Sequence, residues 1–258
     1  MSETATTVLI DSGNSRSKVA LAGHQGILVS DIMSSEQLAA GDVLSWCQSH
    51  DYAIPSYVLA SHVSQPQTRT AISRWAQPLT IHWASTHAQQ AGVTNAYQQW
   101  QTLGCDRWLT LLAAQQRSQG RFPSLIVDTG TALTIDWLDS HGQHLGGWII
   151  PGFELMRDAV LARAPGVFID SDSSRGRATA PASNTSDGLL NGCQAAQSGV
   201  VRQALAVTAE LPAWQHFRVL LCGGNHQELL AVMPDNTDVV PDLVIHGLQV
   251  YAEDLRLR

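Results

Sequence analysis

The chain has few charged residues and no cluster of basic ones. Its 258 residues include 15 Lys and Arg against 22 Asp and Glu, for a net charge of −7. Nucleic-acid-binding proteins usually carry a basic patch or stripe, so this class is disfavoured. No apolar run approaches the roughly 20 residues that span a bilayer. Residues 1–7 are polar and lack the layout of a secretory signal. We therefore expect a cytoplasmic protein with neither a nucleic-acid nor a membrane partner.

Cysteine is scarce, and histidine shows no metal-ligand spacing. The four cysteines lie far apart and form no Cys-x-x-Cys pair, which favours small buried side chains in a reducing compartment. They are Cys47, Cys105, Cys193 and Cys222. For His24, His141 and His144 we expect surface or packing roles.

What the chain does contain is a repeated segment. Val8–Ser15 and Leu125–Ala132 each consist of an apolar run that ends in Asp-x-Gly and small polar residues. Such a run predicts a buried strand followed by a tight turn. In the turn, glycine lets backbone N–H groups approach a phosphate, and the aspartate can hold a divalent cation. Two copies indicate two related halves that bind one nucleotide.

The hydrophobic pattern predicts an α/β fold in which hairpins precede interleaved strands and helices, twice over. Expected strands are 7–11, 18–22, 57–61, 80–83, a hairpin over 124–137, 145–150 and 218–222. Expected helices are 36–49, 67–75, 106–117, 154–163, 187–210 and 242–255, with a further one capped by Asn225 and Glu228. Loops are expected at 85–101 and 171–186, of which the second is expected to be mobile or ordered by ligand.

Three further segments could carry chemistry, and each has an ordinary structural reading. Asp106 and Arg107 stand side by side at a helix start; they suit a general base and an anion-binding group, but a plain N-terminal Asp is common there. Gly223-Gly224 follows a strand, where backbone could lie against a ribose or an anion. Gly146–Gly152 brackets a strand with glycines, which indicates close packing or a ligand.

Taken in order, these motifs resemble type III pantothenate kinases, members of the actin-like, sugar-kinase and heat-shock-protein ATPase superfamily. The resemblance rests on Asp-x-Gly-Asn-Ser-x-x-Lys at 11–18, Gly-x-Asp-Arg at 104–107, Asp-x-Gly-Thr-Ala-x-Thr-x-Asp at 128–136, Gly-Gly-x-Ile-x-Pro-Gly at 146–152 and Gly-Gly at 223–224. Each motif alone is generic, whereas the ordered set is specific and spans nearly the whole chain.

The resemblance implies two RNase-H-like lobes, 1–118 and 119–258, with the nucleotide in the cleft between them. It also implies a homodimer that uses ATP, Mg²⁺ and a monovalent cation, K⁺ or NH₄⁺, to convert pantothenate to 4′-phosphopantothenate. This reaction is the first step of coenzyme A synthesis. Nothing in composition or spacing names pantothenate.

Residue roles also follow from the resemblance alone. Asp106 would be the general base, and Asp11 and Asp128 would hold Mg²⁺ and the monovalent cation. ATP would contact Asp11, Ser12, Gly13, Asn14, Ser15, Arg16, Ser17, Lys18 and Thr131. Pantothenate would contact Tyr97, Gly104, Cys105, Asp106, Arg107 and, across the dimer interface, Thr185.

The departures from the family pattern are mild, and two alternatives stay open. Ser15 stands where threonine is commoner, and Gly188 where a small alanine-like residue is commoner. One alternative is a kinase of another small acceptor on the same fold. The other is a nucleotide-binding accessory or regulatory protein, which the intact Asp106–Arg107 pair disfavours.

Overall fold

The computed structural model describes residues 6–13, 16–24, 26–62, 66–77, 79–170 and 181–256. These residues form two compact units that interleave along the chain. The first takes in residues up to 120 together with 140–146 and 242 onward, and the second takes in 121–139 and 147–241. The predicted lobes, 1–118 and 119–258, stay a prediction.

The first unit is built on a five-stranded sheet in the order β3-β2-β1-β4-β5. Its strands are β1 (Thr7–Ser12), β2 (Arg16–Gly23), β3 (Gly26–Ser34), β4 (Tyr57–His62) and β5 (Thr80–Trp83). β1, β2 and β3 are antiparallel neighbours, while β4 runs parallel to β1 and β5 parallel to β4. Val8, Leu9 and Ile10 in the central strand are fully buried. Burial on both faces explains why β1 is a continuous apolar run.

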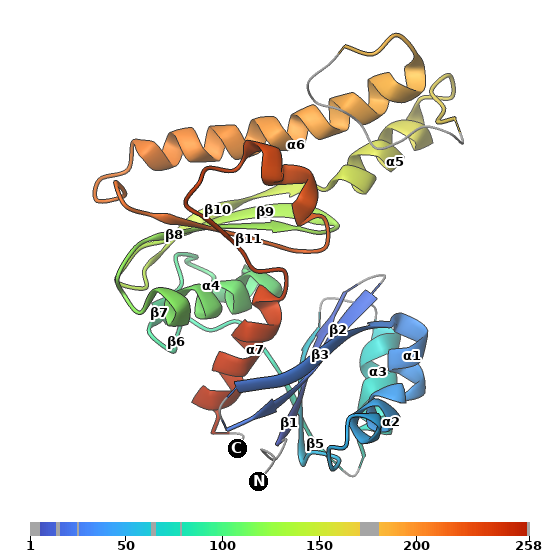
Figure 1. Ribbon diagram of the computed structural model, residues 1–258, viewed down its shortest axis with the longest axis vertical. Helices are drawn as coiled ribbons and strands as arrows, with labels where there is room; N and C mark the ends of the chain where they lie inside the picture. The colour runs from blue at the N-terminus through green and yellow to red at the C-terminus, as the bar shows by residue number, and fades with distance from the viewer. Residues whose placement is uncertain are drawn as a thin grey trace. The chain divides into compact units, whose positions relative to one another are not determined.

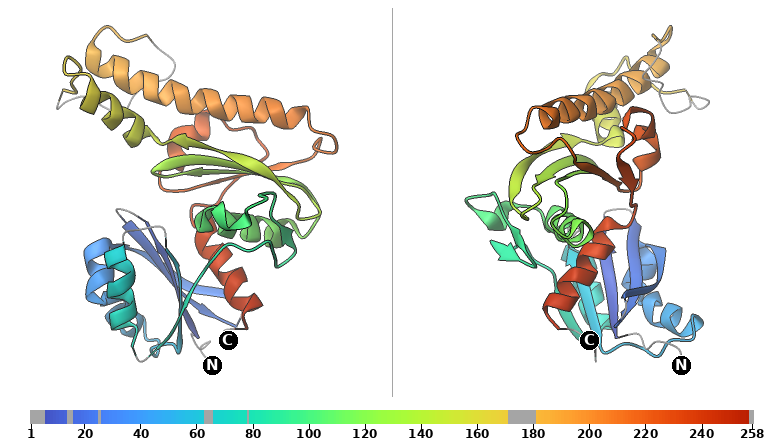
Figure 2. Two further views of the ribbon diagram at one scale, coloured as in Figure 1. Left: turned by 180° about the vertical axis from the view of Figure 1, so that it is seen from behind. Right: turned by 60° about the vertical axis from the view of Figure 1, so that its left-hand side comes forward.

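Helices cover both faces of this sheet. On one face lie α1 (Ser35–Ala40), α2 (Asp42–Ser49) and α3 (Pro66–Trp75); on the other lie α4 (Cys105–Ser118) and α7 (Leu243–Asp254) (Figures 1 and 2). The single helix predicted over 36–49 is wrong, because Gly41 adopts φ +86° and separates α1 from α2. Edge strand β3 was not predicted, since most of its residues are only partly buried or exposed.

Residues 85–101 were predicted to be a loop, and they contain only short regular pieces. Gln89–Gln90 (β6) pairs with Val93–Thr94 (β7), and a 3₁₀ turn covers Trp100–Thr102 (η1). The segment is held together by side chains: Thr86 Oγ1 donates to the carbonyl of Leu103, and Asn95 Nδ2 donates to the carbonyl of His87. It therefore leads in a fixed path to the start of α4.

The second unit repeats the same topology, with strand order β10-β9-β8-β11-β12. Its strands are β8 (Ser124–Thr129), β9 (Ala132–Leu138), β10 (His144–Pro151), β11 (Arg218–Cys222) and β12 (Thr237–Val239). β8 and β9 form the antiparallel hairpin, and β11 pairs parallel with β8, as β4 does with β1. The sequence repeat thus reflects a repeated fold, which confirms the predicted α/β class with two related halves.

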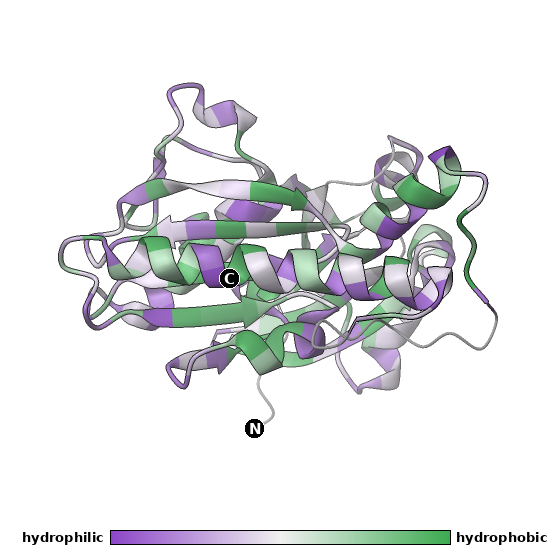
Figure 3. Cartoon of the chain, turned by 90° about the horizontal axis from the view of Figure 1, so that it is seen from above, coloured by the Kyte–Doolittle hydropathy of each residue, from purple (hydrophilic) through white to green (hydrophobic). Residues whose placement is uncertain are grey.

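Helices α5 (Phe153–Arg163) and α6 (Thr185–Ala209) and the 3₁₀ segment η2 (His226–Val232) complete the second unit. Along α6, hydrophilic and hydrophobic residues alternate at short intervals (Figure 3). Val201 and Ala204 of α6 join the core of β8, β9 and β11. None of the helices in the described part of the chain is long and apolar enough to cross a membrane.

The packing of α7 on α4 depends on Gly247. A Cβ on Gly247 would overlap the backbone of Leu109, so the two helices touch main chain to main chain. Any side chain at this crossing forces the helices apart.

We therefore expect Gly247→Ala to lower the free energy of unfolding in urea by about 1–3 kcal/mol, although alanine favours the helix itself. Gly199→Ala is the matched control, because a Cβ on this helical glycine of α6 meets nothing within 4 Å. The control should be neutral or stabilised by up to about 1 kcal/mol. Equal stability of the two variants would contradict the proposed close contact.

Candidate active site

In the first unit, Asp11 stands at the carboxyl end of the buried strand β1. It lies opposite Lys18 in the β1–β2 pairing, and Ser61 Oγ of β4 donates a 2.8 Å hydrogen bond to its Oδ1. Lys18 Nζ in turn lies 2.9 Å from Oδ1 of Asp242, at the start of α7. The β1–β2 hairpin, β4 and the start of α7, which are far apart in sequence, therefore bring polar side chains to one end of the central strand.

The carboxyl group of Asp11 is destabilised in its ionised form. Burial raises its pKa, and the negative charges of Asp106 and Asp242 raise it further; the Ser61 hydroxyl and the Lys18 ammonium act in the opposite direction. A cation would relieve this desolvation and repulsion, so the donor set suits a hard ion such as Mg²⁺. Among the described residues no group of three or more His, Cys, Asp or Glu side chains forms a complete metal cage.

Asp106 lies in the first turn of α4, where the helix dipole favours an anion. Its Oδ1 accepts a 2.9 Å hydrogen bond from the backbone N–H of Arg107. A Cβ on Gly104, which precedes the helix, would overlap Oδ1 of Asp106, so glycine leaves room for the carboxylate. Burial raises the pKa of neighbouring Cys105 to about 12, which keeps its thiol protonated. The prediction that Asp106 begins a helix is confirmed.

Arg107 and Tyr97, both predicted to bind substrate, lie together. Nη1 of Arg107 donates to the Tyr97 hydroxyl at 3.0 Å, and Cζ of Arg107 lies 5.7 Å from the centre of the Tyr97 ring. Arg107 is only 3% exposed, which is unusual for arginine and indicates that its position is fixed. The pair joins a cationic and a phenolic group at the start of α4, the helix that carries Asp106.

In the second unit, the turn after β8 is enclosed by two other glycine turns. A Cβ on Gly152 would overlap the carbonyls of Gly130 and Thr131, and a Cβ on Gly223, at φ +88°, would overlap Thr129 and Oδ1 of Asp128. Gly152 N–H also donates to the Thr131 carbonyl at 2.9 Å. Of the glycines singled out in the sequence, Gly152 and Gly223 therefore serve close packing around the Asp128 turn, whereas a Cβ on Gly146 or Gly224 would meet nothing within 4 Å. This arrangement places the Asp128 carboxylate near the Thr129 carbonyl oxygen, so the donors at this turn are hard oxygen atoms.

Asn225 does not cap a helix as predicted. It makes no side-chain capping bond, and η2 is a 3₁₀ segment, so the capping box with Glu228 is wrong. Instead Asn225 Nδ2 donates to Oε2 of Glu154 at 3.2 Å, and its backbone N–H donates to the Thr129 carbonyl. Tertiary partners across the second unit have replaced the local cap.

The other predicted residues are placed as follows. Gly13 is partly buried, and Ser12 and Ser17 are fully buried. Thr131 and Thr185 are exposed. The Oγ of Ser17 has no hydrogen-bond partner in the described part of the chain. Asn14, Ser15 and the Arg16 side chain lie outside the described residues, as do residues 171–180 of the predicted loop. Cys47, Cys193 and Cys222 are buried free thiols, as predicted, whereas Cys105 is a free thiol that is only partly buried.

Sequence reasoning missed Ser61 and Asp242, which partner Asp11 and Lys18. Ser61 lies inside an apolar strand and Asp242 directly before a helix, positions where small polar residues usually have local roles. Neither residue carried a signal of its long-range contact. Only the pairing of β1 with β4 and the position of α7 reveal it.

Comparisons with known proteins decide the family. The family model for type III pantothenate kinase matches residues 7–206. A type III pantothenate kinase of Idiomarina loihiensis is 38% identical over 69% of this chain and 68% of its own. One from Nitrosomonas eutropha is 31% identical over 98% of this chain and 96% of its own. The chain belongs to the type III pantothenate kinase family.

Solved structures agree at the level of the fold. A Campylobacter jejuni protein described as a conserved putative Baf family transcriptional activator aligns with a TM-score of 0.61 at 17% identity, over 96% of this chain and 98% of its own. A putative 2-dehydro-3-deoxygalactonokinase from Sinorhizobium meliloti aligns with a TM-score of 0.56 at 12% identity, over 96% and 99%. At these low sequence identities, the two structures show a shared fold and nothing about function.

The buried charge of Asp11 leads to a stability prediction. Because the folded-state pKa of Asp11 is raised, its ionised form costs folding free energy above that pKa, and the cost is lost as the pH falls through it. In buffer without nucleotide or pantothenate, and with divalent metals chelated by EDTA, Asp11→Asn should therefore unfold at a higher temperature than wild type at pH 8. We expect at least about 2–4 °C, the shift that 1 kcal/mol gives at this size. The gap should close as the pH falls.

Asp238→Asn is the control, since Asp238 is a half-exposed carboxylate 3.7 Å from Arg218. Removal of an exposed charge should not raise the unfolding temperature. An Asp11→Asn variant no more stable than wild type at pH 8 would contradict the destabilised carboxylate.

Proposed function

We propose that the chain transfers the γ-phosphoryl group of ATP to pantothenate, giving ADP and 4′-phosphopantothenate, the first step of coenzyme A synthesis. Membership of the type III pantothenate kinase family carries the reaction. Two groups at the start of α4 support it: the Asp106 carboxylate, which accepts from the Arg107 backbone N–H, is the candidate base, and the Arg107 guanidinium is the candidate anion-binding group. Each of the two units contributes one Asp-x-Gly turn, and we propose that both bind ATP.

In the proposed mechanism, Asp106 accepts the proton of the pantothenate hydroxyl while the hydroxyl oxygen of pantothenate attacks the γ-phosphorus of ATP. A new P–O bond forms, the bond to the β-phosphate oxygen breaks, and ADP leaves. Arg107 binds the anionic substrate, and Tyr97 with Gly104 and Cys105 lines its site. Thr185 contributes from the second subunit. Catalysis depends chiefly on holding the two substrates in the reactive geometry. Arg107 suits this role because its side chain is buried and hydrogen-bonded to Tyr97.

Two cations complete the proposal. Asp11 would hold Mg²⁺, and the bound ion would neutralise negative charge on the phosphates. A monovalent cation, K⁺ or NH₄⁺, would be held by Asp128. The destabilised Asp11 carboxylate and the packing of Asp128 Oδ1 beside Gly223 and Thr129 support these assignments.

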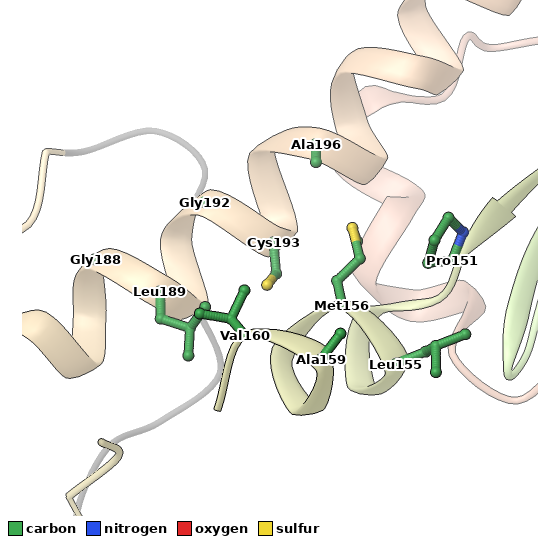
Figure 4. A pocket seen from close by; sticks show the side chains of 10 residues that line it. All are labelled: Pro151, Leu155, Met156, Ala159, Val160, Gly188, Leu189, Gly192, Cys193 and Ala196. Atoms are coloured by element: carbon green, nitrogen blue, oxygen red, sulfur yellow. The ribbon is translucent and has the colours of Figure 1, made fainter. Parts of the chain in front are cut away.

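We propose that the protein is a homodimer through α5 and α6. Between these helices lies an apolar pocket of about 480 Å³ lined by residues such as Met156, Leu189 and Cys193 (Figure 4). Leu155 and Val160 beside it are 47% and 38% exposed. An apolar surface of this kind on a folded protein favours a protein partner. Thr185 lies on the same helix α6, which supports its role across the interface.

The remaining partner and location assignments are proposals of the same kind. A net charge of −7 without a basic cluster supports the absence of a nucleic-acid partner. A cytoplasmic location without a membrane partner suits a biosynthetic kinase.

Substitution of Asp106 separates an enzyme from a nucleotide-binding protein. We expect Asp106→Asn to lower pantothenate-dependent ADP release by at least about 100-fold, the contribution of a general base, with ATP binding by calorimetry retained. The assay contains ATP, Mg²⁺ and K⁺, and a reaction without pantothenate is the blank. Turnover near the wild-type rate would reject Asp106 as base.

The same assay distinguishes the alternatives. Wild-type protein that binds ATP but ignores pantothenate and phosphorylates another small acceptor would be a kinase with a different substrate. Protein that binds ATP and phosphorylates nothing in a small-molecule panel would be an accessory protein.

The dimer proposal is tested by a charge in the apolar surface. We expect Leu155→Glu to convert the dimer to a monomer in light scattering, because burying an unpaired carboxylate is costly. Leu230→Glu is the control, since Leu230 is a 46% exposed leucine of η2 that does not line the pocket. A Leu155→Glu variant that stays dimeric would place the interface elsewhere.

A further inference from the structure

His144, the first residue of β10, has no exposed surface and packs against Tyr97, one of the residues proposed to bind pantothenate. Its ring stacks on that of Tyr97, with centroids 6.0 Å apart and planes inclined by 19°. Its Nδ1 accepts a long, 3.5 Å hydrogen bond from the backbone N–H of Ala96. The sequence suggested only a surface or packing role for this histidine.

Tyr97 links His144 to Arg107. One face of the Tyr97 ring meets the imidazole, while its hydroxyl accepts from Arg107 Nη1 at 3.0 Å. Because a tyrosine side chain has only two rotatable torsions, a ring fixed by stacking also fixes its hydroxyl. The place of the imidazole therefore sets the place of the group that holds the guanidinium.

The backbone around His144 is fixed against the same segment. Thr94 N–H donates to the Gly142 carbonyl at 2.9 Å, and Gln143 Nε2 donates to the Thr94 carbonyl. A Cβ on Gly142 would overlap the carbonyl of Gly92, so the two backbones are in direct contact. Residues 140–146 thus form one face of a rigid support for residues 92–97 within the first unit.

We propose that His144 is a positioning residue for the acceptor site: its ring supports Tyr97, and Tyr97 orients Arg107 toward pantothenate. The inference rests on the proposed function. Because His144 acts on substrate binding alone, its loss raises the KM for pantothenate and leaves kcat and the KM for ATP unchanged. A merely structural histidine would lower stability and affect both substrates alike.

The test compares His144→Ala, His144→Phe and His144→Asn with a matched control. His82→Ala removes another histidine of the first unit that packs against a tyrosine, Tyr57, at 6.2 Å between centroids. We expect His144→Ala to raise the KM for pantothenate about three- to tenfold, the range that an aromatic pair supplies. His144→Phe keeps the ring and should recover most of the loss, whereas His144→Asn keeps only an acceptor and should resemble the alanine variant.

The outcomes separate this inference from the proposed function. An active wild type in which His144→Ala leaves the KM for pantothenate unchanged, or raises both KM values equally, overturns the role of His144 alone. A wild type that ignores pantothenate overturns the function. A crystal structure of the His144→Phe and His144→Asn variants is then the deciding readout: displacement of the Tyr97 hydroxyl from Arg107 in the asparagine variant alone supports the positioning role, and an unmoved pair rejects it.

Discussion

Each unit places a carboxylate near the carboxyl end of a central strand whose other residues are buried. In the first unit, the arrangement of the site follows largely from the cost of that placement. At Asp11 the cost is evident, because burial and two neighbouring carboxylates oppose ionisation. Ser61 and Lys18 offset part of it, and both come from strands that flank β1 in the sheet. The carboxylate therefore depends on correct pairing of three strands, and cannot be fixed by its own turn.

Lys18 extends this dependence to the end of the chain. Its ammonium group lies 2.9 Å from Asp242, which directly precedes α7. α7 can bring Asp242 there only because Gly247 lets it lie against the backbone of α4, the helix that carries Asp106. A single close helix contact thus helps to position both the proposed metal ligand and the proposed base. The unit needs residues 242–256 although they are far from β1 in sequence.

What the sequence could predict is what is encoded locally. The β1–β2 and β8–β9 hairpins, the start of α4 at Asp106 and the repeated Asp-x-Gly turns all arise from short segments, and the structure contains them. The two failures have different causes. Gly41 ends a helix by adopting the left-handed conformation that glycine favours locally, a signal that the apolar spacing over 36–49 did not include. Asn225 donates to the distant Glu154 and makes no local capping bond, so a tertiary partner outweighed a local propensity. His144 has the packing role that was one of its two expected roles, but nothing in its neighbourhood along the sequence predicts Tyr97 as its partner.

The two proposed catalytic carboxylates therefore differ in how they are built. Asp106 is positioned by one turn of chain, through the Arg107 N–H and the space at Gly104, so a short motif suffices to specify it. Asp11 requires β4, β2 and α7, and its ionised form remains unfavourable even with these partners. A cation and a nucleotide that bind the folded state and not the unfolded state would stabilise the folded protein by mass action. The unfavourable ionised Asp11 is then relieved when cation and nucleotide bind. The first unit tolerates its cost in their absence because the remainder of its core stabilises the fold.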